Sequence, residues 1–161
     1  MAVSPDGDYF VVTDSYSNRV RKVNITSGNI ATLAGDGDYN YDGNDGLATA
    51  GGMRRPYGVA VDHIGDVYFS DEHNKRIRKA SNGIISSIAG TGVYGFHGED
   101  VLATTAKLRN PYGVCRDKDG NIYFADKGNH RVRMINISNS KIYTVAGISL
   151  LVFLSLFQIM N

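Results

Sequence analysis

The chain of 161 residues carries 17 basic and 16 acidic side chains, a balance that argues against nucleic-acid recognition by bulk positive charge and leaves only a local basic patch open. The single cysteine, Cys115, excludes an intrachain disulfide and a zinc site built on cysteines. Hydrophobic residues make up 42% of the chain and glycine contributes 19 residues, so we expect a buried core and many tight turns between short strands.

The first unit comprises residues 1–55 and begins inside an expected strand. Residues 2–4 align with residues 60–62 of the second unit, so the start of the first unit is missing. The residues after Met1 have neither the basic start nor the apolar stretch of a secretory signal peptide. After the strands of this unit, the glycine-rich segment 35–55 is expected to lie on the rim of the fold.

The second unit, residues 56–110, shows the alternation of apolar and polar residues that is typical of strands. A hairpin signal, Asn82-Gly83, separates the last two expected strands. Four short antiparallel strands in about 35 residues describe one blade of a β-propeller. The four strands are expected within residues 58–61, 67–70, 76–78 and 84–89.

The long loops that follow the first two units resemble each other. Residues 35–54 and 90–109 have the same length and share glycine, tyrosine and Leu-Ala-Thr positions, so we expect an ordered loop in both units. The apolar end of the second loop is expected to pack as one helical turn between blades. This end contains Leu102, Ala103, Ala106 and Leu108.

The third unit, residues 111–147, establishes the repeat. Pro111-Tyr112-Gly113-Val114 repeats residues 56–59 after 55 positions, and an Arg-Val/Ile-Arg triplet occurs in each unit. Self-similarity at a fixed period is the signature of repeat architectures. We therefore expect an all-β fold, an incomplete β-propeller of about three four-stranded antiparallel blades.

Residues 148–161 form an apolar tail that is not part of the repeat. The stretch 148–160 is shorter than the roughly 20 residues that span a bilayer. Residues 142–146 would lengthen it enough for a tail anchor, so membrane contact is expected only if segment 142–160 inserts, which would remove the last strand of the third blade. We favour the interpretation that the tail is foreign to the propeller, as in a truncated gene or an unspliced transcript.

The pattern of the units resembles the NHL repeat. The matching elements are Pro-Tyr-Gly-Val-x-x-Asp, Gly-Asp/Asn-Val/Ile-Tyr-Phe-x-Asp and Asn-x-x-Arg-Val/Ile-Arg, best represented by residues 111–114, 120–126 and 129–133. The glycine-rich loop ending in Leu-Ala-Thr is similar to that of NHL arrays from bacteria, protists and teneurin-type proteins. The resemblance covers residues 2–147. It implies a complete propeller of six blades or a nearby number, of which this chain is a fragment.

The resemblance also bears on function. Blades of this family serve chiefly as platforms for protein or RNA partners, and a minority of relatives are enzymes, including the lyase of peptide amidation and lactonase-like hydrolases. The sequence marks no nucleophile and no convergent set of metal ligands, so we expect a non-catalytic scaffold for protein–protein interaction. A lyase- or hydrolase-type enzyme and an RNA-binding propeller are the alternatives. No cofactor is expected, and the compartment is undecided.

Three blades would form an open arc with two bare faces. A blade buries its apolar faces against its neighbours, so an uncovered face is unfavourable in water. The remaining blades of a longer parent chain, or self-association of this chain, are therefore expected to cover both faces.

Each unit places an aspartate five residues before an arginine, around a turn between two expected strands. A carboxylate in such a turn accepts backbone N–H groups, and an arginine can bridge to it as a fork. Because every unit carries the pair, we interpret it as structural rather than as a ring of ligand-binding arginines. The pairs are Asp14 with Arg19, Asp71 with Arg76, and Asp126 with Arg131.

Basic, aromatic and histidine side chains near these turns are candidates for partner binding. The arginines could contact phosphates and the tyrosines could stack on RNA bases, although solvated strand positions explain them as well. The two histidines occupy neighbouring positions in the equivalent turn of adjacent units, so they could approach each other, but the spacing provides no third metal ligand. The candidates are Arg54, Arg55, Tyr57, Tyr112, His73 and His130.

Residues 38–43 copy the first half of a calcium-binding loop. Asp38, Asn40 and Asp42 occupy the first ligand positions of such a loop, but its twelfth position is Thr49 instead of a bidentate glutamate. The equivalent segment of the second loop does not keep these ligands. The motif is therefore a weak calcium candidate, and no metal site is expected.

Overall fold

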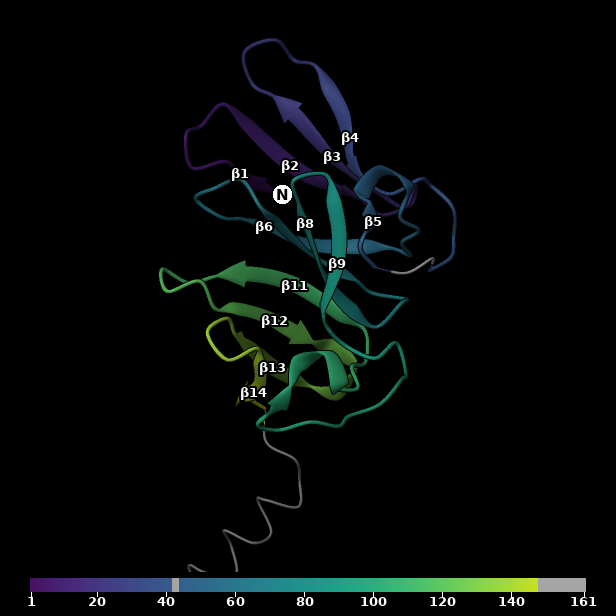
Figure 1. Cartoon of the computed structure of the whole chain (residues 1–161), viewed down its shortest axis with the longest axis vertical. Coiled ribbons are helices and arrows are strands. Elements are labelled where there is room, and N and C mark those ends of the chain that lie inside the picture. The colour runs from purple at the N-terminus through teal and green to yellow at the C-terminus, as the bar shows by residue number, and fades with distance from the viewer. Residues whose placement is uncertain (42–43, 148–161) are drawn as a thin grey trace, which may run out of the picture.

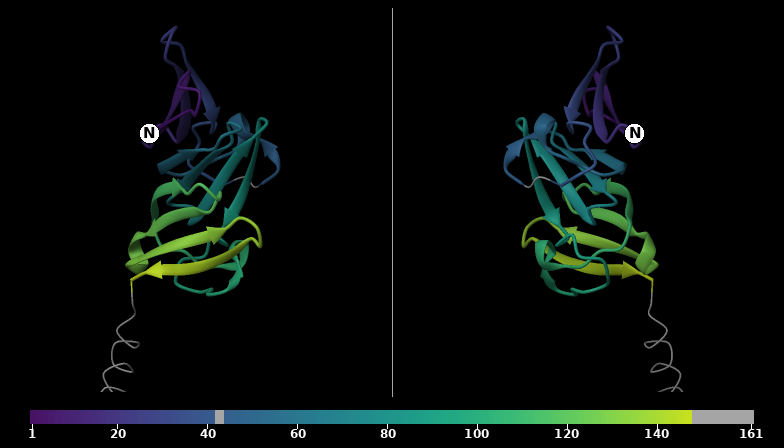
Figure 2. Two further views of the ribbon diagram at one scale, coloured as in Figure 1. Left: turned by 90° about the vertical axis from the view of Figure 1, so that its left-hand side faces the viewer. Right: turned by 90° about the vertical axis from the view of Figure 1, so that its right-hand side faces the viewer.

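Three antiparallel sheets follow one another along the chain and stack in that order, so the fold is all-β (Figure 1). Side views show the same succession of sheets (Figure 2). The computed structural model describes residues 1–41 and 44–147. The apolar tail, 148–161, lies outside these residues. Within the described part of the chain, no helix has the length and apolar character needed to cross a membrane.

Each sheet contains the four antiparallel strands that the sequence predicts for one unit. The first sheet comprises β1 (Ala2–Val3), β2 (Tyr9–Asp14), β3 (Arg19–Asn24) and β4 (Ile30–Ala34). The second comprises β6 (Pro56–Val61), β7 (Val67–Asp71), β8 (Arg76–Ser81) and β9 (Ile84–Ala89). The third comprises β11 (Pro111–Arg116), β12 (Ile122–Asp126), β13 (Arg131–Asn136) and β14 (Lys141–Ala146).

A short fifth strand, which the sequence did not predict, extends the second and third sheets. Strand β5 (Gly46–Leu47) pairs with β9, and β10 (Val101–Leu102) pairs with β14. In both cases the glycine-rich loop supplies the outermost strand of the sheet that follows it. An unpaired edge strand exposes its N–H and C=O groups, and these short strands cover part of that edge.

The expected helical turn is present in both loops, as the 3₁₀ turns η1 (Ala48–Ala50) and η2 (Ala103–Thr105). Ala103, Ala106 and Leu108 are fully buried in the core between the second and third sheets. Leu102 was expected to pack with them, but it is 53% exposed. It belongs to edge strand β10, where its side chain faces solvent.

Strand β7 shows how one sheet contributes to two cores. Val67 and Phe69 lie in the core between the first and second sheets, and Tyr68 lies in the core between the second and third. Successive side chains of a strand point to opposite faces, so this alternation fills both interfaces. The first core also contains Val11, Val20, Met53, Val59 and Ile85, and the second contains Ile77, Ile122, Phe124, Ile135 and Ile142.

The outer face of the third sheet is more exposed than the same face of the second. Ile77 is fully buried, whereas its counterpart one unit later, Val132, is 39% exposed, and Val145 is 53% exposed. The difference arises because the second sheet has a neighbour on that side. The expectation that further blades or a second copy cover this face stays a prediction.

Strands β6 and β11 lie side by side, and the backbone of β11 lies close against Gly58. A Cβ atom at Gly58 would overlap the backbone O of Tyr112 and the backbone N of Val114. The equivalent glycine of the third sheet, Gly113, has no atom within 4 Å of the same Cβ position. The contact between the second and third sheets thus leaves no room for a side chain at position 58.

We expect Gly58→Ala to destabilise the full chain by about 3 kcal/mol, because the overlapped atoms belong to the backbone and can move only if the sheets separate. Gly113→Ala is the matched control and should change the free energy of unfolding by less than about 0.5 kcal/mol. Urea unfolding followed by circular dichroism measures both. Equal effects of the two substitutions would contradict this account of the contact.

Candidate partner-binding face

The candidate residues from the three units gather at one end of the sheets. Pro56 at the start of β6 pairs with Asp71 at the end of β7, and Pro111 pairs with Asp126 in the same way. The segments that precede β6 and β11 therefore lie beside the turns that follow β7 and β12. We call this region the arginine end, and it comprises residues 54–57, 72–76, 109–112 and 127–131.

The ion pairs at the arginine end differ from the predicted pairs. Asp71 lies opposite Arg76 in the ladder, but its carboxylate pairs with Arg78 at 3.3 Å, and both side chains are fully buried. Asp126 likewise pairs with Arg133, at 3.7 Å. The prediction of Asp71–Arg76 and Asp126–Arg131 side-chain pairs was wrong because the second arginine of each triplet, not the first, reaches the buried carboxylate.

The first arginine of the triplet is bound by the glycine-rich loops instead. Arg76 donates a hydrogen bond to the backbone carbonyl of Thr91 at 2.8 Å, and its guanidinium lies over the Tyr41 ring at 3.8 Å. These contacts connect it to the loop after its own sheet and to the loop before it. Arg131 lies over the Phe96 ring at 3.9 Å. This arginine therefore anchors the loops against the sheets.

The first sheet has no counterpart of the buried ion pair. Asp14 is half-buried and has no arginine partner within the described residues. Arg21, which is equivalent to Arg78, donates to the Thr32 hydroxyl at 2.8 Å. Arg19 donates to the backbone carbonyl of Asp36 and so anchors its loop as Arg76 does. The predicted Asp14–Arg19 side-chain pair is thus also replaced by a contact with a loop.

The buried carboxylates also fix the segments that lead into the inner strands. Asp71 accepts hydrogen bonds from the backbone N–H of Arg54 at 2.7 Å and from the side-chain amide of Asn74 at 2.9 Å. Asp126 accepts one from the backbone N–H of Arg109, also at 2.7 Å. Burial raises the pKa of both carboxyls, and these hydrogen bonds oppose that effect. Aspartate is needed at both positions because its carboxylate binds a backbone N–H and a buried arginine at once.

We expect Asp71→Asn to lower the free energy of unfolding by about 3–5 kcal/mol, because it removes the carboxylate that pairs with the buried Arg78 guanidinium. Asp14→Asn changes the equivalent residue of the first sheet, where no such pair exists, and should cost less than about 1 kcal/mol. Chemical denaturation of the full chain gives both values. A small effect of Asp71→Asn would show that the pair is dispensable.

Two tyrosines of the inner strands stack across the contact between the second and third sheets. The ring centroids of Tyr57 and Tyr112 are 4.2 Å apart, with an interplanar angle of 25°. The Lys127 ammonium lies 4.6 Å from the centroid of the Tyr112 ring. Arg55 lies over the ring of Tyr16, which is 89% exposed. The arginine end thus presents aromatic rings and cations together.

A hollow of about 290 Å³ lies beside this stack, between the second sheet and the loop that follows it. Glu72 forms part of its wall and accepts a hydrogen bond from Asn110 at 2.9 Å. His73 is 3.4 Å from Glu72 through Nε2 and 3.2 Å from the Tyr39 hydroxyl through Nδ1. The lining residues are Arg54, Glu72, His73, Lys75, Tyr94 and Asn110.

The two histidines of the arginine end are separate in the structure. His73 contacts Tyr39 and Glu72, and burial lowers the pKa of its imidazole. His130 follows the 3₁₀ turn η3 (Lys127–Asn129) with a φ of 54°, and no hydrogen bond or ring contact joins it to His73. No group of three or more His, Cys, Asp or Glu side chains that could hold a metal occurs in residues 1–41 and 44–147.

The calcium candidate is only partly within the described residues, because Asp42 lies outside them. The backbone N–H of Asp38 donates to the carboxylate of Asp36 at 2.8 Å. The backbone carbonyl of Asn40 accepts a hydrogen bond from the side chain of Asn74 at 3.1 Å. The described part of this loop is therefore held to the arginine end by its backbone.

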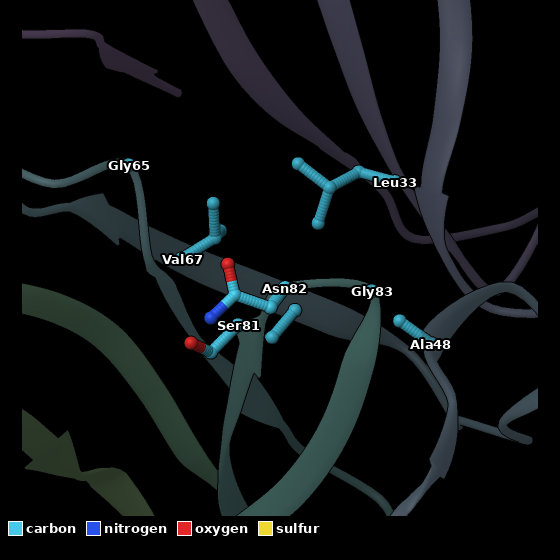
Figure 3. A pocket seen from close by; sticks show the side chains of 8 residues that line it. Leu33, Ala48, Gly65, Val67, Ser81, Asn82 and Gly83 are labelled. Carbon is cyan, nitrogen blue, oxygen red and sulfur yellow. The ribbon is translucent and has the colours of Figure 1, made fainter.

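A second hollow, of about 150 Å³, lies between the first and second sheets (Figure 3). Leu33 and Val67 face it from the two sheets, and the Asn82–Gly83 turn closes it. None of its eight lining residues is titratable. We interpret it as a packing gap between sheets rather than as a binding site.

Four residues around the hollow of the arginine end were not predicted from the sequence. They come from a loop, a turn and a strand entry that are distant in the chain, so no local motif connects them. One signal was present: a tyrosine and an arginine recur together in the two long loops, 55 positions apart. The missed residues are Tyr39, Glu72, Tyr94 and Asn110.

Comparison with solved structures defines the class of protein. The fold is similar to virginiamycin B lyase from Staphylococcus aureus (TM-score 0.57, 18% identity, covering 91% of this chain and 40% of that one). It is also similar to a chain of a nidogen/laminin complex (0.63, 17%, 90% and 46%) and to an auxiliary nutrient binding protein from Bacteroides thetaiotaomicron (0.67, 21%, 84% and 36%). The three sheets are blades of a β-propeller.

Comparison of sequences identifies the type of blade. The NHL repeat model matches residues 108–134. The chain is 25% identical over 138 residues to human NHL repeat-containing protein 2, covering 79% of this chain and 19% of that protein. The third blade therefore contains an NHL repeat, and the chain is similar to NHL-repeat proteins over most of its length.

The chain is much shorter than its relatives. It is 27% identical over 149 residues to the protein SUPPRESSOR OF QUENCHING 1, chloroplastic, of Arabidopsis thaliana, covering 88% of this chain and 14% of that protein. It is 33% identical over 91 residues to human teneurin-4, of which it covers 3%. The chain thus spans less than a fifth of the length of these relatives.

Proposed function

We propose that this chain is a non-catalytic propeller scaffold that binds a protein partner through the arginine end. The observation that carries the proposal is the stacked pair Tyr57–Tyr112 with Lys127 above it. Tyrosine and arginine are enriched among the residues that dominate binding energy at protein interfaces. Here they are concentrated at one end of the sheets.

The arginine end is also organised in advance of binding. The backbone carbonyl of Tyr57 accepts a hydrogen bond from Thr13 of the first sheet at 2.7 Å, and the Tyr57 ring is held by its stack on Tyr112. Arg54 is fixed through its backbone to Asp71. Side chains that are already ordered lose little conformational entropy when a partner binds. A rigid aromatic and cationic surface of this kind suits a scaffold.

Two alternatives receive less support. An enzyme needs an acid, a base or a metal that converges on one point, and His73 is already bonded to Tyr39 and placed against Glu72. RNA binding would also use aromatic rings with cations. The buried acid Glu72 beside the stack and the net charge of +1 favour a protein surface over a polyphosphate chain.

Site-specific crosslinking tests the proposal. A photoreactive residue placed at Tyr112 in the full chain, expressed in its native host, should capture one protein that the same residue at Ile64 does not. Ile64 is 71% exposed and lies in the turn between β6 and β7 at the opposite end, so it is the matched control. The captured protein, once purified, should bind the chain about thirtyfold more weakly after Tyr112→Ala, as expected for a dominant interface residue.

Tyr112→Phe keeps the stacked ring and should retain most of the affinity, which separates loss of contact from loss of folding. Equal capture from positions 112 and 64, or a partner whose affinity is unchanged by Tyr112→Ala, would contradict the proposal. Capture of RNA alone, with an affinity that falls steeply with salt, would replace it with the nucleic-acid alternative.

A further inference from the structure

The hollow of the arginine end lies between two equivalent stacks of an arginine on a tyrosine. Arg54 lies over Tyr39 at 4.0 Å, and Arg109 lies over Tyr94 at 4.8 Å. The second stack repeats the first after 55 positions. Arg54 of the first stack and Tyr94 of the second both line the hollow. The distance between these two walls of the hollow therefore depends on the spacing of the sheets.

The cations of the hollow have unused donors. The Arg54 guanidinium has no hydrogen bond or ion pair with any described residue, and its Nε atom is buried without a partner. Lys75 donates to the backbone carbonyl of His73 at 2.6 Å, which leaves two of its three N–H donors. Burial lowers the pKa of the His73 imidazole and so disfavours its charged form. The positive charge therefore comes from Arg54 and Lys75.

Both carboxylate oxygens of Glu72, the acid among the lining residues, contact neighbouring side chains of the hollow. The Glu72 side chain is 8% exposed. Its Oε1 accepts the Asn110 hydrogen bond, and its Oε2 lies 3.4 Å from His73. Glu72 thus positions an amide and an imidazole, while two cations, Arg54 and Lys75, line the same hollow. Arg54 and Lys75 are half-buried, and an opposite charge would bind their free donors by charge-assisted hydrogen bonds.

We propose that this hollow binds a carboxylate carried by the protein partner, on an acidic side chain or at a chain end. The inference rests on the proposed function and adds the chemistry that the partner must bring. A guanidinium presents a planar fork of N–H donors that matches the two oxygens of a carboxylate. The volume of about 290 Å³ admits the carboxylate with its methylene stem, and the Tyr94 ring provides an apolar wall for that stem.

Peptide titration of the purified full chain tests the site. The probe is a capped triglutamate peptide, and the matched probe is capped triglutamine. The triglutamate peptide should bind and shift the NMR signals of residues lining the hollow, with an affinity that decreases as salt rises. Arg54→Gln should weaken binding by about tenfold or more, because it removes a charge-assisted hydrogen-bond donor. Arg54→Lys should restore part of the affinity.

The controls separate a specific site from general attraction. Lys118→Gln removes an exposed cation in the turn between β11 and β12, at the opposite end, and should leave the affinity unchanged. Lys75→Gln changes the second cation and should weaken binding even if Arg54→Gln proves poorly folded by circular dichroism. Equal binding of triglutamine, or no effect of either substitution in folded protein, would overturn the assignment. Binding of inorganic phosphate without preference for triglutamate would also overturn it.

The test also separates this inference from the proposed function. If the partner captured at Tyr112 binds equally well to Arg54→Gln, the carboxylate site is wrong and the scaffold function stands. If triglutamate binds at Arg54 but no partner is captured at Tyr112, the hollow binds carboxylates and the scaffold proposal fails.

Discussion

Each sheet of this protein has apolar side chains on both faces, and only a neighbouring sheet can keep them from water. Val67 and Phe69 of β7 pack toward the first sheet while Tyr68 packs toward the third. The hydrophobic effect therefore acts between sheets, as in other repeat proteins whose units contact only their neighbours. The close approach at Gly58 sets how near the inner strands can lie. All other features of the molecule depend on this stacking.

The arginine end follows from the stacking. Two tyrosines that are 55 residues apart can stack only because β6 and β11 are held side by side. The hollow beside them exists because Arg54 and Tyr94 repeat a stack at the spacing of the sheets. Neither feature belongs to a single blade. A surface built from equivalent residues of adjacent units keeps its geometry as long as the sheets remain in contact.

Much of the fold could be predicted from the sequence, because period-two alternation and a repeat of about 55 residues both report on backbone geometry. The strands β5 and β10 could not, since two residues in a glycine-rich loop carry no periodic signal. The partner of Asp71 was also misjudged: spacing along the chain favours Arg76, but depth in the sheet decides the pairing, and Arg78 is the buried one. The hollow could not be predicted, because its residues come from segments far apart in the sequence.

The glycine-rich loops between blades also affect the order in which the chain unfolds. The loop after the first sheet is held at its start by Arg19 and contributes β5 to the edge of the second sheet. The next loop is held by Arg76 and contributes β10 to the third sheet. The outer edge strand of the second and of the third blade thus comes from a loop that the preceding blade holds in place. Unfolding of one blade would release the edge strand of the next blade. Unfolding should therefore spread toward the C-terminus more readily than toward the N-terminus.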